Sequence, residues 1–253
     1  MQGYVRFAAL GDSTTAGIGD RTHAGWRGWA RLLADALATT YDVSFCNLAK
    51  PGCTSREVRD RQLPEALAHR PDLASVIVGV NDTMRSTWNP IMLRADLLGT
   101  AGALNAAGAE LLTVRFHDHG AVLGLPAVLR RPLAARIATV NEVYAEIHAI
   151  YGGIQVDLTV RPEILTRPYW SVDRMHPSEL GHRALAAAFA DRMRTVGLHC
   201  EPPGLGPEGG SPSTWRSDLA WMTREGAPWM GRRARDLGPW AIRAAAGRVR
   251  AGR

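Results

Sequence analysis

Short apolar runs alternate with longer segments of helical periodicity through the first 200 residues of the chain. The apolar runs are rich in β-branched and aliphatic residues and are bounded by polar or glycine-containing turns, as buried strands are. We place strands at residues 4–10, 42–48, 73–79, 110–116 and 154–158. Strands that alternate with helices predict β-α-β units, and therefore a parallel sheet.

Helical periodicity fills the intervals between these strands. Segments of ordinary helical length and period span residues 26–38, 56–69, 91–107 and 132–150. A last helix is expected to begin at Pro177-Ser178-Glu179 and to run to about Val196, because proline is favoured in a first helical turn. The pattern predicts one α/β domain over residues 1–200.

The composition changes after residue 200. Residues 201–212 are rich in proline and glycine and predict a linker. Residues 201–253 carry nine arginines against five acidic residues, and the segment holds four of the eight tryptophans: Trp215, Trp221, Trp229 and Trp240. We expect this basic, Trp-rich tail to dock on the domain, with the tryptophans as apolar anchors. Contact with nucleic acid or with a membrane surface is the less favoured alternative.

Composition narrows the class of protein. The chain has 253 residues, of which 46% are hydrophobic and 21% charged, so disorder, a collagen helix and a coiled coil are excluded for the whole. Three cysteines are too few for a disulfide scaffold of this size and are expected to be reduced thiols. No signal-like segment precedes the first strand, and no apolar run approaches a membrane span. We therefore expect a cytoplasmic protein without a transmembrane segment.

A serine follows the first predicted strand, in the motif Gly11-Asp12-Ser13, and leads into a glycine-containing turn. A serine at the carboxyl end of a strand can present its hydroxyl in the crevice where open α/β sheets bind ligands. The alternative is an ordinary turn in which Asp12 and Ser13 cap the next helix. This motif by itself leaves both interpretations open.

A second motif, Asp173-Arg174-Met175-His176, precedes the last predicted helix. A carboxylate three residues before a histidine can orient the imidazole and stabilise its protonated form, which would supply a base for a serine. The alternative is a surface histidine beside an aspartate that caps a turn.

Candidate oxyanion donors follow the second and third strands. Gly52 offers a backbone N–H group, and Asn81, in the motif Gly79-Val80-Asn81-Asp82, offers a side-chain amide. If the strand order is second, first, third, fourth, fifth, then the first strand lies between the second and the third. Ser13, Gly52 and Asn81 would then emerge at the carboxyl ends of three adjacent strands.

Together these motifs resemble those of the SGNH hydrolase family, the GDSL-type esterases and lipases, over residues 5 to about 190. The resemblance implies a three-layer, flavodoxin-like α/β/α sandwich with a five-stranded parallel sheet and no cofactor. It implies Ser13 as nucleophile, His176 as general base and acid, and Asp173 as the orienting carboxylate. The oxyanion hole would consist of the Ser13 and Gly52 N–H groups and the Asn81 side chain.

Other residues are candidates for a substrate pocket because they lie near the predicted carboxyl edge of the sheet. The apolar segment 120–129 suits an acyl chain, and equally suits packing on the core. The aromatic candidates are open to the same two interpretations. The candidates are Trp88, His117, Leu123, Leu125 and Trp170. His117, Asp118 and His119 lack a third cluster with zinc-ligand spacing, so a polar loop at the pocket rim is favoured over a metal site.

We therefore expect a serine hydrolase that cleaves a carboxylic ester of a small molecule through an acyl-enzyme intermediate. An acyltransferase or a deacetylase that tailors a sugar or a secondary metabolite is the first alternative. A non-catalytic binding protein is the second, although a binder would not need a nucleophile, a base and an oxyanion donor together.

Overall fold

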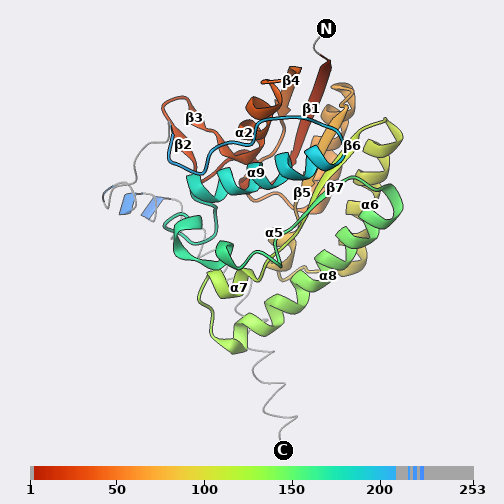
Figure 1. Ribbon diagram of the computed structural model, residues 1–253. Helices are drawn as coiled ribbons and strands as arrows, with labels where there is room; N and C mark the ends of the chain where they lie inside the picture. The colour runs from red at the N-terminus through yellow and green to blue at the C-terminus, as the bar shows by residue number, and fades with distance from the viewer. Residues whose placement is uncertain (1–2, 209–215, 217–218, 221–222, 225–253) are drawn as a thin grey trace, which may run out of the picture.

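Five parallel strands form the central sheet of the computed structural model, which describes residues 3–208, 216, 219–220 and 223–224 (Figure 1). The strand order is β4-β1-β5-β6-β7, so β1 lies between β4 and β5. The strands are β1 (Tyr4–Gly11), β4 (Asp42–Asn47), β5 (Leu73–Ile77), β6 (Glu110–Arg115) and β7 (Ile154–Asp157). The predicted sheet and its order are confirmed, and each strand ends within two residues of its predicted end.

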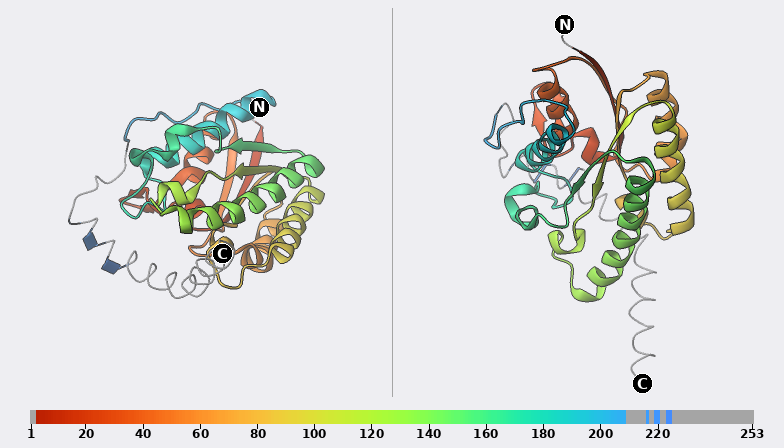
Figure 2. Two further views of the ribbon diagram at one scale, coloured as in Figure 1. Left: turned by 90° about the horizontal axis from the view of Figure 1, so that it is seen from below. Right: turned by 45° about the vertical axis from the view of Figure 1, so that its right-hand side comes forward.

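Helices cover both faces of this sheet, which gives the predicted three layers (Figure 2). On one face, α2 (Gly28–Leu37) packs on α9 (Glu179–Thr195), and the rings of Trp29 and Phe189 stack with their centroids 5.1 Å apart. The other face carries α4 (Leu63–Ala68), α6 (Pro90–Ala106) and α8 (Ala127–Tyr151). All five residues of β5 are buried, as expected for the middle strand of a sheet covered on both sides.

Two helical predictions differ from the structure. The segment predicted as one helix over 56–69 consists of α3 (Ser55–Glu57), a π-helical turn η1 (Val58–Gln62) and α4. The helix predicted to begin at residue 132 begins at Ala127, five residues earlier. Pro132 lies inside α8, where its missing N–H group removes a single bond, to the carbonyl group four residues before it. Pro132 therefore does not mark the start of this helix.

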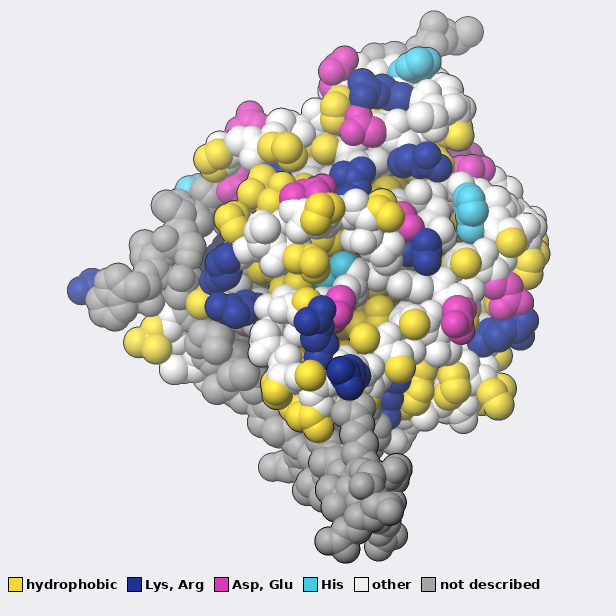
Figure 3. Space-filling model, turned by 60° about the horizontal axis from the view of Figure 1, so that its bottom comes forward, with side chains coloured by type: hydrophobic (Ala, Val, Ile, Leu, Met, Phe, Trp, Pro, Cys, Tyr) yellow, Lys and Arg dark blue, Asp and Glu magenta, His cyan; other side chains and the backbone are white. Residues whose placement is uncertain are grey.

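Short elements fill the loops, most of them at the carboxyl ends of the strands, and these were not predicted. In Figure 1 the strands run downward, so α5 and α7 lie below the sheet. The short elements are α1 (Ser13–Ala16), the hairpin β2 (Arg21–Thr22) and β3 (Gly25–Trp26), α5 (Val80–Thr83), α7 (His119–Val122), η2 (Pro162–Leu165) and η3 (Arg167–Tyr169). Figure 3 looks at this end of the molecule, where apolar side chains surround scattered arginine and acidic side chains.

The first residues of the predicted linker lie against the domain. Arg183, on α9, is 2% exposed and donates to the backbone oxygens of Gly204 and Glu208, at 3.0 and 2.7 Å. The Glu208 N–H group donates to Glu179 Oε1 at 2.8 Å. Residues 201–208 are thus fixed to the start of α9. The four tail tryptophans, and with them the predicted docking of the tail, lie outside the described residues.

A buried histidine connects α9 to the loop after α1 and to the start of α2. His182 Nδ1 accepts a hydrogen bond from the Trp29 N–H group at 3.2 Å, and Nε2 lies 2.9 Å from the Ile18 carbonyl oxygen, to which it donates. The ring is fully buried, and burial lowers the pKa of His182 to about 4. One ring nitrogen accepts a hydrogen bond and the other donates one, which is the pattern of a neutral imidazole. His182 is therefore an uncharged structural link.

This link predicts an acid-sensitive fold. The unfolded chain binds a proton at His182 near the ordinary histidine pKa of about 6.5, whereas the folded chain binds it only near 4. The contribution of the neutral ring to the free energy of unfolding is therefore fully present above about pH 6.5. It is lost as the pH falls toward 4, and the loss is on the order of 3 kcal/mol. We expect His182→Gln, which can keep both hydrogen bonds, to reduce the loss of unfolding free energy between pH 7 and 4.5 in urea titrations. An unchanged pH dependence would exclude His182 as the source.

No helix in the described part of the chain combines the length and apolar character needed to cross a membrane. The three cysteines, Cys46, Cys53 and Cys200, are free. The cytoplasmic location stays a prediction.

Candidate active site

Ser13 begins α1 directly at the carboxyl end of β1. Asp12 caps this helix: its carboxylate accepts the Thr14 N–H group at 3.0 Å. The preceding Gly11 is held from the other side by the buried Gln62, the last residue of the π-helical turn, whose amide binds the Gly11 N–H and carbonyl groups, both at 2.9 Å. The strand end that carries Ser13 is thus fixed by side chains from two directions.

Ser13, His176 and Asp173 form a continuous hydrogen-bonded chain. Ser13 Oγ lies 2.9 Å from His176 Nε2, and His176 Nδ1 lies 2.7 Å from Asp173 Oδ2. The first two residues are 163 positions apart in the sequence. The side chains of His176 and Asp173 are 13% and 3% exposed, so the pair is shielded while the ring still reaches the surface.

The Asp173 carboxylate is surrounded by donors from its own loop. Its Oδ1 atom accepts the Ser171 hydroxyl at 2.7 Å and the N–H groups of Met175 and His176 at 2.9 and 3.1 Å. Burial opposes ionisation of this group. The hydrogen bond and the charge of His176, together with the loop donors, outweigh burial and hold the pKa of Asp173 well below its usual range. The carboxylate therefore stays ionised over the whole neutral range.

A close backbone contact places the His176 loop against the Ser13 loop. Gly19 has a φ of +103°, and a Cβ atom at this position would lie 2.0 Å from the Pro177 carbonyl oxygen. No side chain fits there, and the conformation itself favours glycine. Gly19 thus permits the approach that brings His176 within hydrogen-bonding distance of Ser13.

Asn81 lies next to Ser13 and joins two loops. It is 5% exposed, and its Nδ2 atom lies 3.1 Å from both Asp12 Oδ2 and the Cys53 carbonyl oxygen. Burial, which disfavours the charged form, raises the pKa of Asp12 to about 6. The bond to Cys53 places the loop that contains Gly52 beside Asn81, as the strand order predicts.

The Gly52 loop is fixed by further bonds. Ser55 donates its hydroxyl to Asp82 at 2.7 Å, and the Gly52 carbonyl oxygen accepts Arg85 Nη2 at 3.0 Å. Gly52 has a φ of +78°, and no heavy atom lies within 4 Å of the position of an added Cβ. The Gly52 backbone is therefore held at its carbonyl group by Arg85, and the side on which a Cβ atom would lie is open.

A small crevice of about 40 Å³ opens at Ser13. Of the predicted site residues, Ser13, Asn81, His176 and Leu123 line it. Several other lining residues were not among the predicted site residues: Asp12, Thr14, Val80, Met84, Phe116 and Met175. Four of these are sequence neighbours of motif residues, so proximity to the motifs was a usable signal. Phe116 follows β6 and no motif marks it, whereas His119, which also lines the crevice, belongs to the segment predicted as a polar loop at the pocket rim.

The fold and the geometry agree with what similarity to known proteins indicates. The model of the GDSL-like lipase/acylhydrolase family matches residues 9–184. The chain belongs to this family. Its similarity to an acetylxylan esterase from Geobacillus stearothermophilus is 24% identity over 179 residues, which are 66% of this chain and 78% of that protein.

Solved structures of other proteins share the fold of this one. The crystal structure of TesA superposes with a TM-score of 0.59 at 23% identity, over 76% of this chain and 99% of TesA. A catalytic mutant of the G. stearothermophilus acetylxylan esterase gives a TM-score of 0.61 at 21% identity, over 79% of this chain and all of that one. The resemblance drawn from the motifs is confirmed, and the protein is a carboxylic ester hydrolase.

The remaining predicted pocket residues of this GDSL-like hydrolase lie around the crevice and not in it. Trp88 lines a separate polar pocket, and its ring centroid lies 5.6 Å from the Arg136 guanidinium. Leu125 is partly buried against the core. His117 and Trp170 are buried and line a cavity behind Phe116, with their rings 4.9 Å apart.

His119, and not His117, faces the crevice from the segment that was expected to form a polar rim. His119 Nδ1 lies 3.2 Å from the His117 carbonyl oxygen, to which it donates as a neutral ring, and burial lowers the pKa of His119 to about 4. The His119 ring stacks on that of His117 at 4.1 Å. Within the described residues, no group of three or more histidine, cysteine or acidic side chains is arranged to hold a metal ion.

Proposed function

We propose that Ser13 is the nucleophile of this ester hydrolase and that the reaction passes through an acyl-enzyme. The hydrogen-bonded chain from Ser13 through His176 to Asp173 carries this proposal. An ionised carboxylate only accepts hydrogen bonds, so His176 Nδ1 carries the proton and Nε2 presents a lone pair to the Ser13 hydroxyl. That tautomer is the one a general base requires.

Each step then has a named group. Ser13 Oγ attacks the ester carbonyl carbon while His176 Nε2 takes the hydroxyl proton, and the resulting imidazolium is stabilised by Asp173. The proton passes to the leaving alcohol as the carbon–oxygen bond breaks, which leaves the acyl group on Ser13. Water, deprotonated by His176, attacks the acyl-enzyme and releases the carboxylic acid and free Ser13.

The carbonyl oxygen that becomes negative in each tetrahedral intermediate needs hydrogen-bond donors. We assign this role to the N–H groups of Ser13 and Gly52 and to Asn81 Nδ2. The contacts of Asn81 with Asp12 and Cys53, both 3.1 Å long, support the assignment because they hold the amide at the crevice in one orientation. The developing oxyanion carries a full charge, which the Cys53 carbonyl oxygen does not, so it is the stronger acceptor for the N–H group that Asn81 donates to Cys53.

The size of the crevice favours a small acyl group. The crevice, of about 40 Å³, is much smaller than the polar pocket beside the oxyanion loops, of about 350 Å³. A short acyl group suits so small a space, and the similarity to an acetylxylan esterase points to acetyl. We therefore propose short acyl esters, acetyl esters above all, as substrates.

A polar pocket beside the oxyanion loops supports a hydroxyl-rich alcohol as the other half of the ester. This pocket, of about 350 Å³, adjoins the site through Ser55 and Asp82, and it combines Trp88 with Arg56, Arg85 and other polar side chains. A tryptophan surrounded by hydrogen-bonding groups can stack on a sugar ring and bind its hydroxyls. An acetylated carbohydrate fits this chemistry.

Stopped-flow hydrolysis of p-nitrophenyl acetate tests the acyl-enzyme, and acetate release tests the alcohol. We expect mass spectrometry of the quenched enzyme to find one acetyl group on the peptide that contains Ser13. We also expect faster acetate release from acetylated xylo-oligosaccharides than from ethyl acetate. Turnover with acetyl groups on another residue would overturn the assignment of Ser13.

Asn81→Ala is expected to lower kcat by roughly 10²- to 10³-fold, because one oxyanion donor is lost while substrate binding is largely kept. The measurement is kcat and KM with p-nitrophenyl acetate, together with the urea midpoint of unfolding. A role limited to joining the loops would instead lower stability and leave kcat of the folded fraction near normal, and that outcome would remove Asn81 from the oxyanion hole.

A further inference from the structure

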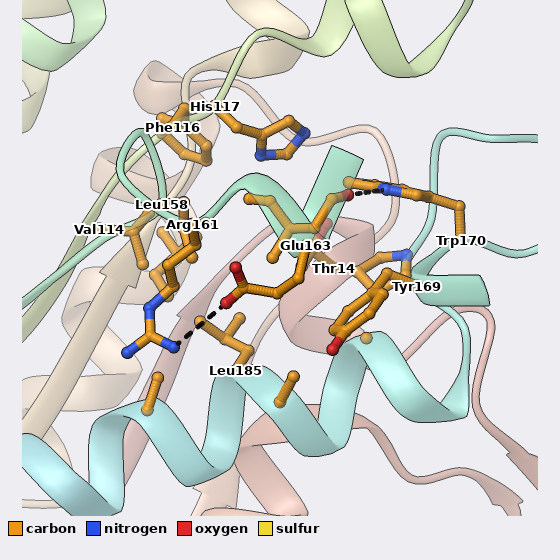
Figure 4. Close-up of a pocket in the computed structure, with 16 residues that line it drawn as sticks. Thr14, Val114, Phe116, His117, Leu158, Arg161, Glu163, Tyr169, Trp170 and Leu185 are labelled. Carbon is orange, nitrogen blue, oxygen red and sulfur yellow. Dashed lines mark hydrogen bonds and ion pairs between the residues drawn. The ribbon is translucent and has the colours of Figure 1, made fainter. Parts of the chain in front are cut away.

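A second cavity lies behind the catalytic crevice, between the sheet and α9 (Figure 4). Its volume is about 60 Å³, larger than that of the crevice at Ser13. Its walls are mainly aliphatic and come from strands, from the loop after β7 and from α9; they include Val114, Leu158, Ile164 and Leu185. An apolar space of this kind suits a hydrocarbon chain.

Phe116 separates this cavity from the crevice. Phe116 and Thr14 are the two residues that line both spaces, and Phe116 carries the larger side chain. In Figure 4, Phe116 and His117 stand at the opposite end of the cavity from the Arg161 guanidinium. An acyl group bound at Ser13 therefore contacts Phe116 before it can reach the cavity.

The Phe116 wall is held rigidly. Its backbone N–H and carbonyl groups both bind the buried side chain of Asn141, at 2.7 and 2.8 Å. Its ring packs edge-on against Tyr144, with the centroids 5.7 Å apart. The Tyr144 hydroxyl is fixed in turn by the backbone of Val78, at 2.8 and 3.0 Å. A side chain fixed at both ends cannot swing aside at low cost.

The interior of the cavity is uncharged. His117 is 5% exposed, and burial lowers its pKa well below the usual value, so its ring is neutral. The charged groups that line the cavity, Arg161 and Glu163, are 38% and 45% exposed and pair with each other at 3.7 Å. These two belong to the solvent side of the cavity, and a chain arriving from Ser13 meets aliphatic and aromatic side chains.

We propose that Phe116 determines the acyl length that this enzyme accepts, and that the cavity behind it is an acyl-chain pocket closed off by its ring. This proposal rests on the proposed function, because it takes Ser13 as the atom that carries the acyl group. With Phe116 in place, the acyl group is confined to the crevice. With the ring removed, the two spaces join and a chain of several carbons extends from Ser13 toward Leu185.

The test measures kcat/KM for p-nitrophenyl esters of two to eight carbons with the full-length enzyme and its Phe116→Ala variant. We expect the wild-type enzyme to prefer acetate. Each buried methylene strengthens binding about fourfold, so four additional methylenes set an upper limit of about 10²-fold. We expect the hexanoate-to-acetate ratio to rise by at least tenfold in Phe116→Ala, and by less in Phe116→Leu, which also guards against a failure of the alanine variant to fold.

Two further variants distinguish the effect of removing the Phe116 ring from that of a general loosening of the core. Leu185→Ala enlarges the cavity without touching the crevice, and we expect it to keep the wild-type chain-length profile. Adding Ala184→Leu to Phe116→Ala fills the joined space from α9, and we expect it to cancel the gain for hexanoate. An unchanged profile in folded Phe116→Ala, or a wild-type enzyme that already prefers hexanoate, overturns the proposal. Absence of any acyl-enzyme on Ser13 in the wild type refutes the proposed function instead.

Discussion

Ser13→Ala is expected to abolish ester hydrolysis, with kcat lowered by at least roughly 10⁴-fold, because the proposed nucleophile is gone. What remains would be the small acceleration from the oxyanion donors and from substrate binding alone. The fold should be unaffected, since Ser13 Oγ contacts His176 at the surface of the crevice and supports no element of the core. Hydrolysis of p-nitrophenyl acetate by the purified variant gives the rate.

Covalent labelling with a fluorophosphonate probe tests the same prediction without a measurement of turnover. The wild-type enzyme should be labelled covalently and Ser13→Ala should not. Ser86→Ala is the matched control, because Ser86 is an exposed serine in the loop between α5 and α6 and lines no part of the crevice. Persistent labelling of Ser13→Ala would show that another residue is the nucleophile.

Asp173→Asn is expected to lower kcat by about 10⁴-fold while changing the geometry little. An asparagine amide at this position donates a hydrogen bond to His176 Nδ1, which moves the ring proton to Nε2. The ring then faces Ser13 with an N–H group and cannot accept its proton. The variant also loses the negative charge that stabilises the imidazolium.

The control for this variant is Asp157→Asn. Asp157, at the end of β7, is a partly exposed aspartate that pairs with Arg115 at 2.7 Å and does not line the crevice. We expect this variant to keep nearly normal kcat. A folded Asp173→Asn enzyme with turnover close to that of the wild type would mean that Asp173 does not orient the base.

The sheet could be predicted from the sequence because a strand buried on both faces must be apolar along its whole length. The run from Leu73 to Ile77 is the clearest example, and all of it is buried. The approach of Asn81 and of the Gly52 loop to Ser13 was also predictable, because parallel strands deliver the residues that follow them to one edge of the sheet, whereas the pairing of Ser13 with His176 was expected from the family resemblance. The motifs sufficed once the strand order was known.

The lining of the crevice was much less predictable. Phe116 and His119 are there because β6 ends in a turn that Asn141, from the middle of α8, holds by two hydrogen bonds to Phe116. A contact across 25 residues leaves no local pattern in the sequence. The π-helical turn at Val58–Gln62 is similar, since its apolar periodicity reads as an ordinary helix. Its function is visible only in the bonds of Gln62 to Gly11.

The contact between Gly19 and Pro177 has a consequence for redesign of the enzyme. It joins the Ser13 loop to the His176 loop through main-chain atoms, and its only requirement on side chains is that residue 19 has none. The walls of the crevice, such as Leu123 and Met84, take no part in it. Selection for new substrates can therefore vary those walls without breaking this contact, whereas libraries that vary Gly19 should consist almost entirely of inactive members.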